Sequence, residues 1–156
     1  MAEAMKNFNR LMRKLDALGI NAQPALNRST VQITTKAAAD ARRMAPSNKE
    51  PQSRSEGSTP LKNAISENFT QEGPVEVGHV VVASDHGAYV EFGTGQRGAS
   101  SPSPPKWDGA LSYREDWAGM EALPYLYPAA VENRDLYAQA ATVALEATIA
   151  AVKGVR

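Results

Sequence analysis

The chain has 156 residues, with 17 Lys and Arg against 17 Asp and Glu, two His and no Cys. This length fits a single domain, and a formal net charge of zero argues against a general binder of nucleic acid or anionic membranes. The absence of Cys excludes disulfides and thiolate chemistry, and two His make a four-ligand structural zinc site an unexpected feature. The 26 Ala leave few large side chains for a core, and small cores often depend on oligomerisation.

The neutral total conceals an uneven distribution of charge. Residues 1–62 carry eleven basic and five acidic side chains, whereas residues 63–156 carry six basic and twelve acidic ones. Such polarity can orient a neighbouring copy, although solvated helix faces are the simpler interpretation. No run approaches the ~20 apolar residues of a membrane span, and residues 1–20 are amphipathic and charged, unlike a signal peptide. We therefore expect a protein made in the cytoplasm, without a membrane partner.

Two helices are predicted at the start of the chain. An apolar stripe favours a first helix that ends at Gly19. A second helix is predicted from about Pro24 to Ala45, and Pro46 stops it. Residues 47–60 contain no large apolar residue and predict a long mobile loop. The first stripe is Phe8, Leu11, Met12, Leu15 and Leu18; the second is Leu26, Ile33, Ala37, Ala41 and Met44.

An antiparallel hairpin is predicted next. Ile65, Glu67 and Phe69 alternate with small polar residues, as in a half-buried strand. Residues 71–74 predict a turn, and residues 75–84 predict the second strand. One side of that strand would carry Val75, Val77, His79, Val81 and Ala83, and the other Val80 and Val82.

The remaining residues predict short elements, a loop and a long helix. Residues 85–98 favour a short strand or a single helical turn broken by glycines, and residues 96–122 predict a second long polar loop. Residues 124–128 predict a short extended segment, followed by a helix from Ala129 to about Lys153. The expected buried face of this helix is Leu136, Ala140, Val143, Ala144, Ala147 and Ala151. This order predicts one α+β domain over 1–156, in which a small antiparallel sheet packs against N-terminal helices and a long C-terminal helix, with two long loops.

No convergent catalytic site is predicted. Ser84, Asp85 and His86 are adjacent, and side chains at successive positions do not converge. A metal site would need His79 and His86 brought together across a turn, without the spacing of known metal motifs. The glycine-rich residues 93–98 lack the Lys-Ser/Thr ending of a phosphate loop. We therefore expect no enzyme, no cofactor and no metal; the enzymatic alternative is a small hydrolase that uses His86 and Glu91.

Two tryptophans stand out in the second predicted loop. Trp107 and Trp117 are costly to leave in water, and large aromatic residues are favoured anchors at interfaces. The alternative is that both indoles fold back onto their own domain. Both long loops exceed the usual length of connectors, so 47–60 and 96–122 are expected to contact other subunits or proteins.

Four segments follow one another in a familiar order: Ala45-Pro46, GSTPLKNAI at 57–65, HGAYVEFGT at 86–94 and LPYLYPA at 123–129. In order and approximate spacing they resemble the tail-component or tail-completion proteins of long-tailed bacteriophages, which join the tail tube to the head. The similarity extends from about residue 25 to the end. The loop after Ala45-Pro46 and the excursion after Gly95 are longer than the family pattern.

The resemblance implies a structural virion protein of the phage neck or tail, made in the bacterial cytoplasm. Copies are expected to form a hexameric ring that completes the head-proximal end of the tail tube. Implied partners are the tail tube protein and the head connector or stopper protein, with the tape-measure protein as a further candidate. Genome DNA would pass through without sequence-specific binding. The alternatives are a head-side connector or stopper, or a small cytoplasmic binding domain unrelated to phage.

The signature residues also have physical roles that do not depend on the family. Gly93 permits a turn with positive φ, and Thr94 can hydrogen-bond across it. Glu91 in an extended segment would point to solvent or a neighbouring subunit; the alternative is a purely conformational corner. Pro124 and Pro128 would limit a short edge segment.

Basic residues of the N-terminal helices are expected to meet a neighbouring copy or to line the channel. The acids available for such contacts include Glu91, Glu121, Glu132 and Asp135. The complete set of candidate assembly residues is Arg42, Arg43, Glu91, Phe92, Gly93, Thr94, Trp107, Trp117, Pro124, Tyr125 and Pro128.

Overall fold

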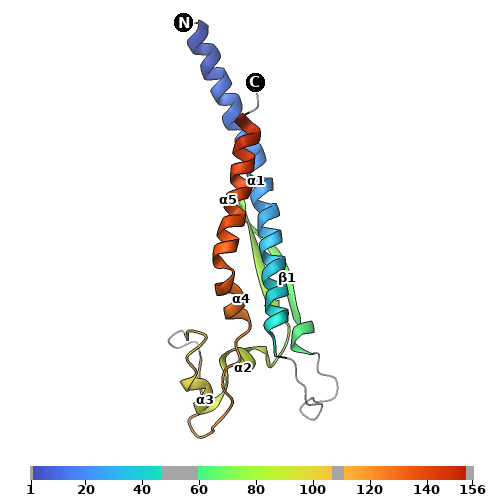
Figure 1. Cartoon of the computed structure of the whole chain (residues 1–156), viewed down its shortest axis with the longest axis vertical. Helices are drawn as coiled ribbons and strands as arrows, with labels where there is room; N and C mark the ends of the chain where they lie inside the picture. Colours follow the sequence, from blue (N-terminus) through green and yellow to red (C-terminus); the bar gives the residue numbers. More distant parts are fainter. Residues whose placement is uncertain (1, 47–59, 107–110, 154–156) are drawn as a thin grey trace. The chain divides into compact units, whose positions relative to one another are not determined.

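The computed structural model describes residues 2–46, 60–106 and 111–153, without the side chains of residues 2–8. The elements are α1 Ala2–Met44, the 3-10 helix η2 Leu61–Asn63, β1 Ile65–Glu72, β2 Val75–Val82, α2 Gly87–Phe92, α3 Gly95–Ser100, α4 Leu126–Glu132 and α5 Arg134–Lys153 (Figure 1). The predicted α+β class is confirmed. By its contacts the chain divides into two units: the first unit comprises 1–33, 69–78 and 135–156, and the second unit 34–68 and 79–134.

The prediction of two N-terminal helices is wrong, because α1 is one helix of 43 residues that contains both Gly19 and Pro24. A Pro inside a helix removes a backbone hydrogen bond and costs about 3 kcal/mol, and Gly costs about 1 kcal/mol relative to Ala. Packing along one face can outweigh such local preferences. On α1 this face continues beyond Pro24 with the buried Ala25 and Ser29.

The predicted hairpin is confirmed. Strands β1 and β2 pair, and their two-residue connection, which includes Gly73 at φ 61°, makes the pair antiparallel. Ile65 is buried, and Glu67 and Phe69 are less exposed than the polar residues between them. The second strand ends at Val82, two residues earlier than predicted.

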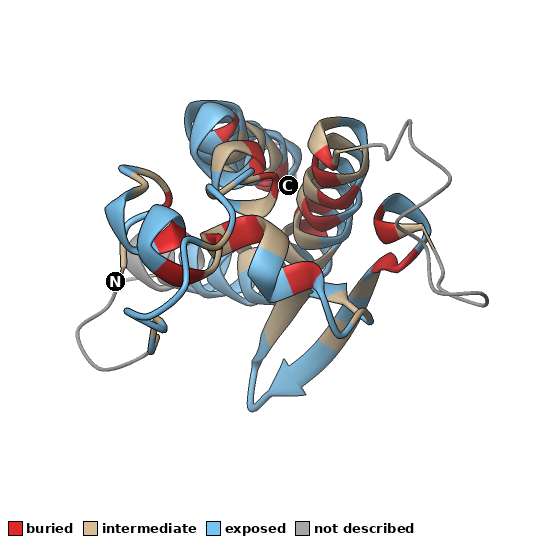
Figure 2. Ribbon diagram, turned by 90° about the horizontal axis from the view of Figure 1, so that it is seen from below, coloured by how far each residue is buried: buried red, intermediate tan, exposed pale blue. Residues whose placement is uncertain are grey.

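The second unit contains the core cluster. Alanines of α1 pack with residues of η2, β1 and α4, and Tyr125 is the largest fully buried side chain of the described residues. Figure 2 shows the buried residues as short stretches on the helices, while much of the hairpin is exposed. The buried members of the cluster are Ala38, Ala41, Ala45, Leu61, Ile65, Tyr125 and Ala129.

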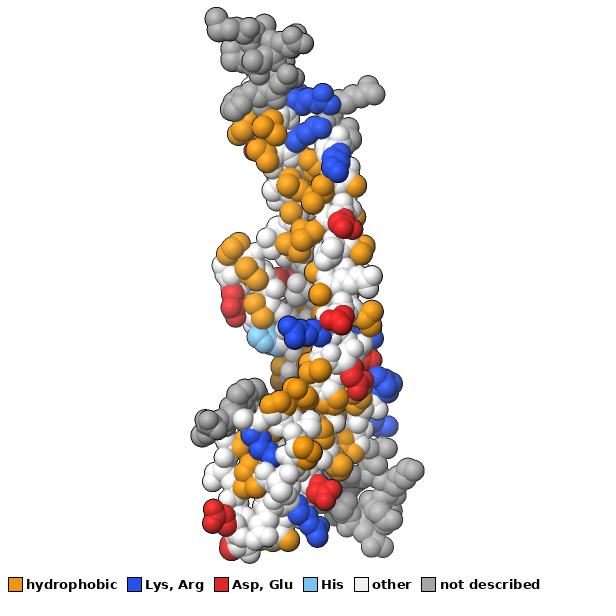
Figure 3. Space-filling view, turned by 60° about the vertical axis from the view of Figure 1, so that its left-hand side comes forward, with side chains coloured by type: hydrophobic (Ala, Val, Ile, Leu, Met, Phe, Trp, Pro, Cys, Tyr) orange, Lys and Arg blue, Asp and Glu red, His pale blue; other side chains and the backbone are white. Residues whose placement is uncertain are grey.

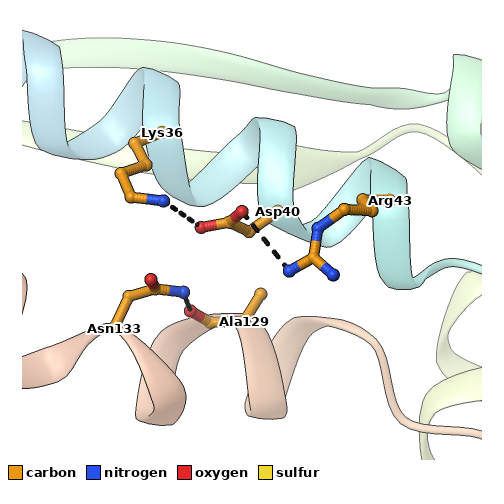
Figure 4. Close-up of polar contacts among 5 residues, drawn as sticks. All are labelled: Lys36, Asp40, Arg43, Ala129 and Asn133. Atoms are coloured by element: carbon orange, nitrogen blue, oxygen red, sulfur yellow. Dashed lines mark hydrogen bonds and ion pairs between the residues drawn. The ribbon is translucent and has the colours of Figure 1, made fainter.

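The predicted single C-terminal helix is divided at Asn133. Helix α4 already begins at Leu126, and Asn133 separates it from α5. The Asn133 amide donates a hydrogen bond to the backbone oxygen of Ala129 at 3.1 Å, which offers the chain an alternative to helix continuation (Figure 4).

An ion-pair group on α1 lies beside α4 in the second unit (Figure 4). Asp40 accepts a hydrogen bond from Lys36 at 2.8 Å and pairs with Arg43 at 3.6 Å. The hydrogen bond from Lys36, aided by the charges of both cations, lowers the pKa of the Asp40 carboxyl against the effect of burial.

The predicted buried face of α5 is partly wrong. Leu136 and Val143 are 52% and 56% exposed, whereas Thr148 and Val152 are buried. Alanines and larger apolar residues occur on several sides of this helix, so hydrophobic periodicity alone does not select one face.

Candidate assembly site

The two signature segments meet at Glu91 in the second unit. The Glu91 Oε2 atom accepts backbone N–H bonds from Tyr125 at 2.7 Å and Leu126 at 2.9 Å. Its Oε1 atom accepts the N–H of Tyr127 at 2.9 Å. Glu91 is only 3% exposed. The carboxylate therefore ties α2 to the start of α4.

The start of α4 explains why a buried carboxylate is stable there. The first four N–H groups of a helix lack partners within the helix, and its N-terminus carries a partial positive charge. Tyr125 precedes α4, Leu126 and Tyr127 begin it, and Pro128 follows without an N–H group. One carboxylate thus satisfies every free donor at this end.

Two predictions for these segments are wrong. Residues 87–92 form a helix and not an extended segment, in line with the helical turn given above as the alternative to a strand. The Glu91 side chain is buried and so does not point to solvent or a neighbour. Residues 124–128 are not an extended edge segment between two prolines, since α4 begins at Leu126. Glu91 is therefore not available as a surface acid for a basic patch.

Tyr125 completes the contact between the two segments. Its ring is fully buried, and its hydroxyl donates a hydrogen bond to the Gly87 oxygen at 3.4 Å. Burial, with a smaller effect of the Glu91 charge, raises the pKa of Tyr125 to about 12. The neutral phenol is therefore the form that this site holds.

The Gly93-Thr94 turn closes the loop that follows it. Gly93 has the predicted positive φ of 73°, and a Cβ atom there would lie 2.6 Å from the Met120 oxygen. Thr94 and Met120 form an antiparallel bridge with N···O distances of 2.8 and 3.0 Å. Thr94 Oγ1 also accepts the Met120 N–H at 3.1 Å, a partner 26 residues away and not the local partner across the turn that was predicted. The predicted loop 96–122 is thus wrong at its start, which is α3, and its return is fixed to Thr94.

A hollow of about 680 Å³ lies beside this bridge. Aromatic and aliphatic side chains line it, among them Phe92, Tyr113 and Met120. Two further lining residues, Tyr89 and Trp117, are 60% and 52% exposed. Such aromatic surface is typical of protein interfaces. Trp107 and residues 47–59 lie outside the described residues.

The two arginines at the end of α1 differ in their contacts. Arg42 Nε donates to the Ile65 oxygen at 3.0 Å, and its Nη2 atom donates to Glu67 at 2.7 Å. Arg42 therefore joins α1 to β1 within the chain, whereas a contact with a neighbour or a channel was expected. Arg43 is 67% exposed in its side chain and makes only the long pair with Asp40 among the described ion pairs.

Of the groups considered for catalysis, Ser84 and His86 do meet, contrary to the expectation for such close positions. Ser84 Oγ and His86 Nδ1 lie 3.1 Å apart in the exposed link before α2. Glu91, the carboxylate of the hydrolase alternative, is already engaged with three backbone donors. Within 2–46, 60–106 and 111–153, no group of three potential acidic or His ligands is placed to hold a metal ion.

Two contacts of the signature residues had no clear signal in the sequence. Met120 is 26 residues from Thr94, and Tyr125 is 34 residues from Glu91. Gly119 before Met120 indicates only that a turn is possible there. A backbone donor carries no side-chain signature, so the partners of Glu91 could not be identified from residue types.

Across the described part of the chain, no helix combines the length and the apolar character needed to cross a membrane. Comparisons with protein-family models, with curated proteins and with solved structures give no match.

Proposed function

We propose that the chain is a structural protein of the neck or tail of a long-tailed bacteriophage virion. Made in the host cytoplasm, it forms a ring, expected to be a hexamer, at the head-proximal end of the tail tube. The ring joins the tube to the head connector, and the genome passes through it without sequence-specific binding. The role is one of assembly, not catalysis.

The observation that carries this proposal is the contact between the two signature segments. Glu91 of the Glu-Phe-Gly-Thr segment binds the backbone at the start of the Pro-Tyr-Leu-Tyr-Pro-Ala segment. The two motifs of the resemblance therefore share one structural role. Two unrelated chance matches would not be expected to meet in this way.

Exposed apolar side chains support an assembling protein. Trp117, Tyr89, Leu136 and Val143 each expose more than half of their surface. Large exposed apolar surface is unusual in a protein that acts alone and commonly marks an interaction site. A ring with partners at both ends would cover such residues.

Deletion of the gene from the phage genome that encodes it tests the proposal. We expect electron micrographs of the lysate to show filled heads and separate tails, because the joint is missing. Complementation from a plasmid should restore infectious particles. Heads that have lost their DNA would instead favour the head-side stopper, and normal particles would contradict both roles.

Variants refine the same complementation assay. Trp117→Ala removes an exposed aromatic residue from the hollow, and we expect a lower titre of infectious phage. Leu123→Ala is the matched control, because Leu123 is also half exposed but does not line the hollow. Equal titres for the two variants would remove the hollow from the assembly surface.

A further inference from the structure

The N-terminal part of α1 extends past the end of α5 in the first unit. Lys14 Nζ donates a hydrogen bond at 3.2 Å to the backbone oxygen of Lys153, the last residue of α5. The two helices run antiparallel (Figure 1). Among the described residues, the part of α1 before Lys14 therefore has no α5 beside it. We call residues 2–15, which include Lys14 at this contact and the exposed Leu15 after it, the overhang.

The overhang continues the helix face that packs on α5 further along. Ala25 and Ser29 on this face are buried and line a groove together with residues of α5. Leu11 and Leu15 on the same face are 54% and 52% exposed. Leu11 and Leu15 are thus uncovered, whereas Leu18 on the same face is half-buried. Its positions alternate by four and three residues, as in coiled coils: 11, 15, 18, 22, 25 and 29.

Helix α5 has an uncovered apolar stripe of its own. The residues of this α5 stripe are Leu136, Val143, Ala147 and Ala150, and all four are exposed. Their spacing of seven, four and three residues places them along one side of the helix. Ala147 also borders the groove between α1 and α5, whereas Thr148 and Val152 are buried on the adjacent side of α5.

The overhang and the α5 stripe match in charge and length. Arg10 and Lys14 lie beside the leucines of the overhang, whereas Asp135 and Glu146 lie beside the α5 stripe. Figure 3 shows basic and hydrophobic side chains together toward the N-terminal end of α1. At 1.5 Å per residue, residues 2–15 span about 20 Å and residues 136–150 about 22 Å.

We propose that the overhang of one copy packs on the α5 stripe of a neighbouring copy. This inference rests on the proposed function, because it names the contact that joins the subunits of the ring. A contact between two different surfaces of one chain propagates from copy to copy, and it closes when the rotation closes. The leucines supply apolar burial, and the opposite charges set orientation.

Paired variants test the contact by sedimentation velocity over a concentration series. Leu11→Glu with Leu15→Glu disrupts the overhang, and Leu136→Glu with Val143→Glu disrupts the stripe. We expect the wild type to self-associate and each disrupted chain to bind at least about 100-fold more weakly. Ile20→Glu and Ile149→Glu are the controls, because these residues are exposed on other sides of the same helices. Controls that dissociate equally would overturn the proposal.

A mixture of the two disrupted chains gives a sharper result. Each chain keeps one intact surface, so the mixture should form heterodimers and no larger species. A misfolded chain could not do this, so the mixture separates loss of contact from loss of fold. A mixture that stays monomeric would overturn the proposal. A wild-type chain that stays monomeric throughout the series would do the same.

The phage assay separates this contact from the proposed function. If the disrupted overhang still gives full self-association and full complementation, the contact is wrong and the function stands. If the contact behaves as expected but gene deletion leaves normal particles, the function is wrong and the contact stands. If the wild type is monomeric and the overhang variant fails to complement, the overhang binds another tail protein and not a second copy of this chain.

Discussion

The buried contacts of the second unit and the exposed helix faces of the first unit leave their side chains in opposite environments. In the second unit, Glu91 bonds three backbone donors and the ring of Tyr125 is fully buried. In the first unit, Leu11 and Val143 keep more than half of their surface exposed, and the buried Ser29 hydroxyl has no hydrogen-bond partner among the described residues. Interactions closed within a chain stabilise its fold, whereas apolar groups left open are available to another molecule. We therefore assign stability mainly to the buried contacts of the second unit, and assembly surface to the first unit and to the hollow around Trp117 in the second.

The largest loss of stability is expected from substitution of Glu91, which tests the comparison between the units most directly. Glu91→Ala should lower the free energy of unfolding by about 3–4 kcal/mol, because three donors lose a charged acceptor. Glu91→Gln should cost about half as much, since one oxygen remains. Urea denaturation followed by circular dichroism measures both, with the exposed Glu121→Ala as the control. A loss below about 1 kcal/mol for Glu91→Ala would contradict the assigned role.

Substitution of one glycine in each unit tests how the two units differ in stability. Gly93→Ala should destabilise the protein by about 2–3 kcal/mol, because positive φ and the close Met120 oxygen both oppose a Cβ atom. Gly19→Ala in α1 should stabilise it by up to about 1 kcal/mol, since among the described residues nothing beyond the adjacent helix backbone lies within 4 Å of its added Cβ. Thermal melts of the two variants should shift in opposite directions. Shifts of the same sign would show that one site is misassigned.

The buried phenol of Tyr125 predicts an alkaline loss of stability. Because its native pKa is raised to about 12, the native state holds this proton more tightly than the unfolded chain. This contribution is complete below about pH 10 and is lost as the pH rises to about 12, by about 2 kcal/mol.

Tyr125→Phe isolates this contribution, because its ring cannot ionise. The difference in unfolding free energy between the wild type and Tyr125→Phe should shrink over this pH interval. Tyr89→Phe alters an exposed ring and should follow the wild type. Parallel curves for all three proteins would exclude the buried phenol as the cause.

The smallest change in stability is expected from substitution of Ser29 in the first unit. Ser29→Ala should raise the free energy of unfolding by about 1 kcal/mol, because it removes a buried hydroxyl that has no partner in the described part of the chain and adds a better helix former. Thr142→Ala is the control, since its exposed hydroxyl already bonds the Ala138 oxygen. A destabilised Ser29→Ala would indicate that this hydroxyl does have a partner.

The sequence by itself determined the features that depend on neighbouring residues. Alternation along Ile65–Glu72 and the turn at Gly73 specified the hairpin, and glycine at position 93 permitted the positive φ. Helical periodicity specified that the two ends of the chain are helical. Side chains close in sequence meet through local geometry alone, so their pattern is sufficient for such features.

Only the tertiary structure decided the rest. Tertiary contacts determine that α1 continues past Gly19 and Pro24 and which side of α5 is buried. They also place the Glu91 carboxylate against backbone donors 34 residues away. In each case the deciding partner is distant in sequence, and for Glu91 it is a backbone group common to almost every residue type. Packing and hydrogen bonds of this kind outweigh local preferences of about 1–3 kcal/mol, because burial acts on many residues at once.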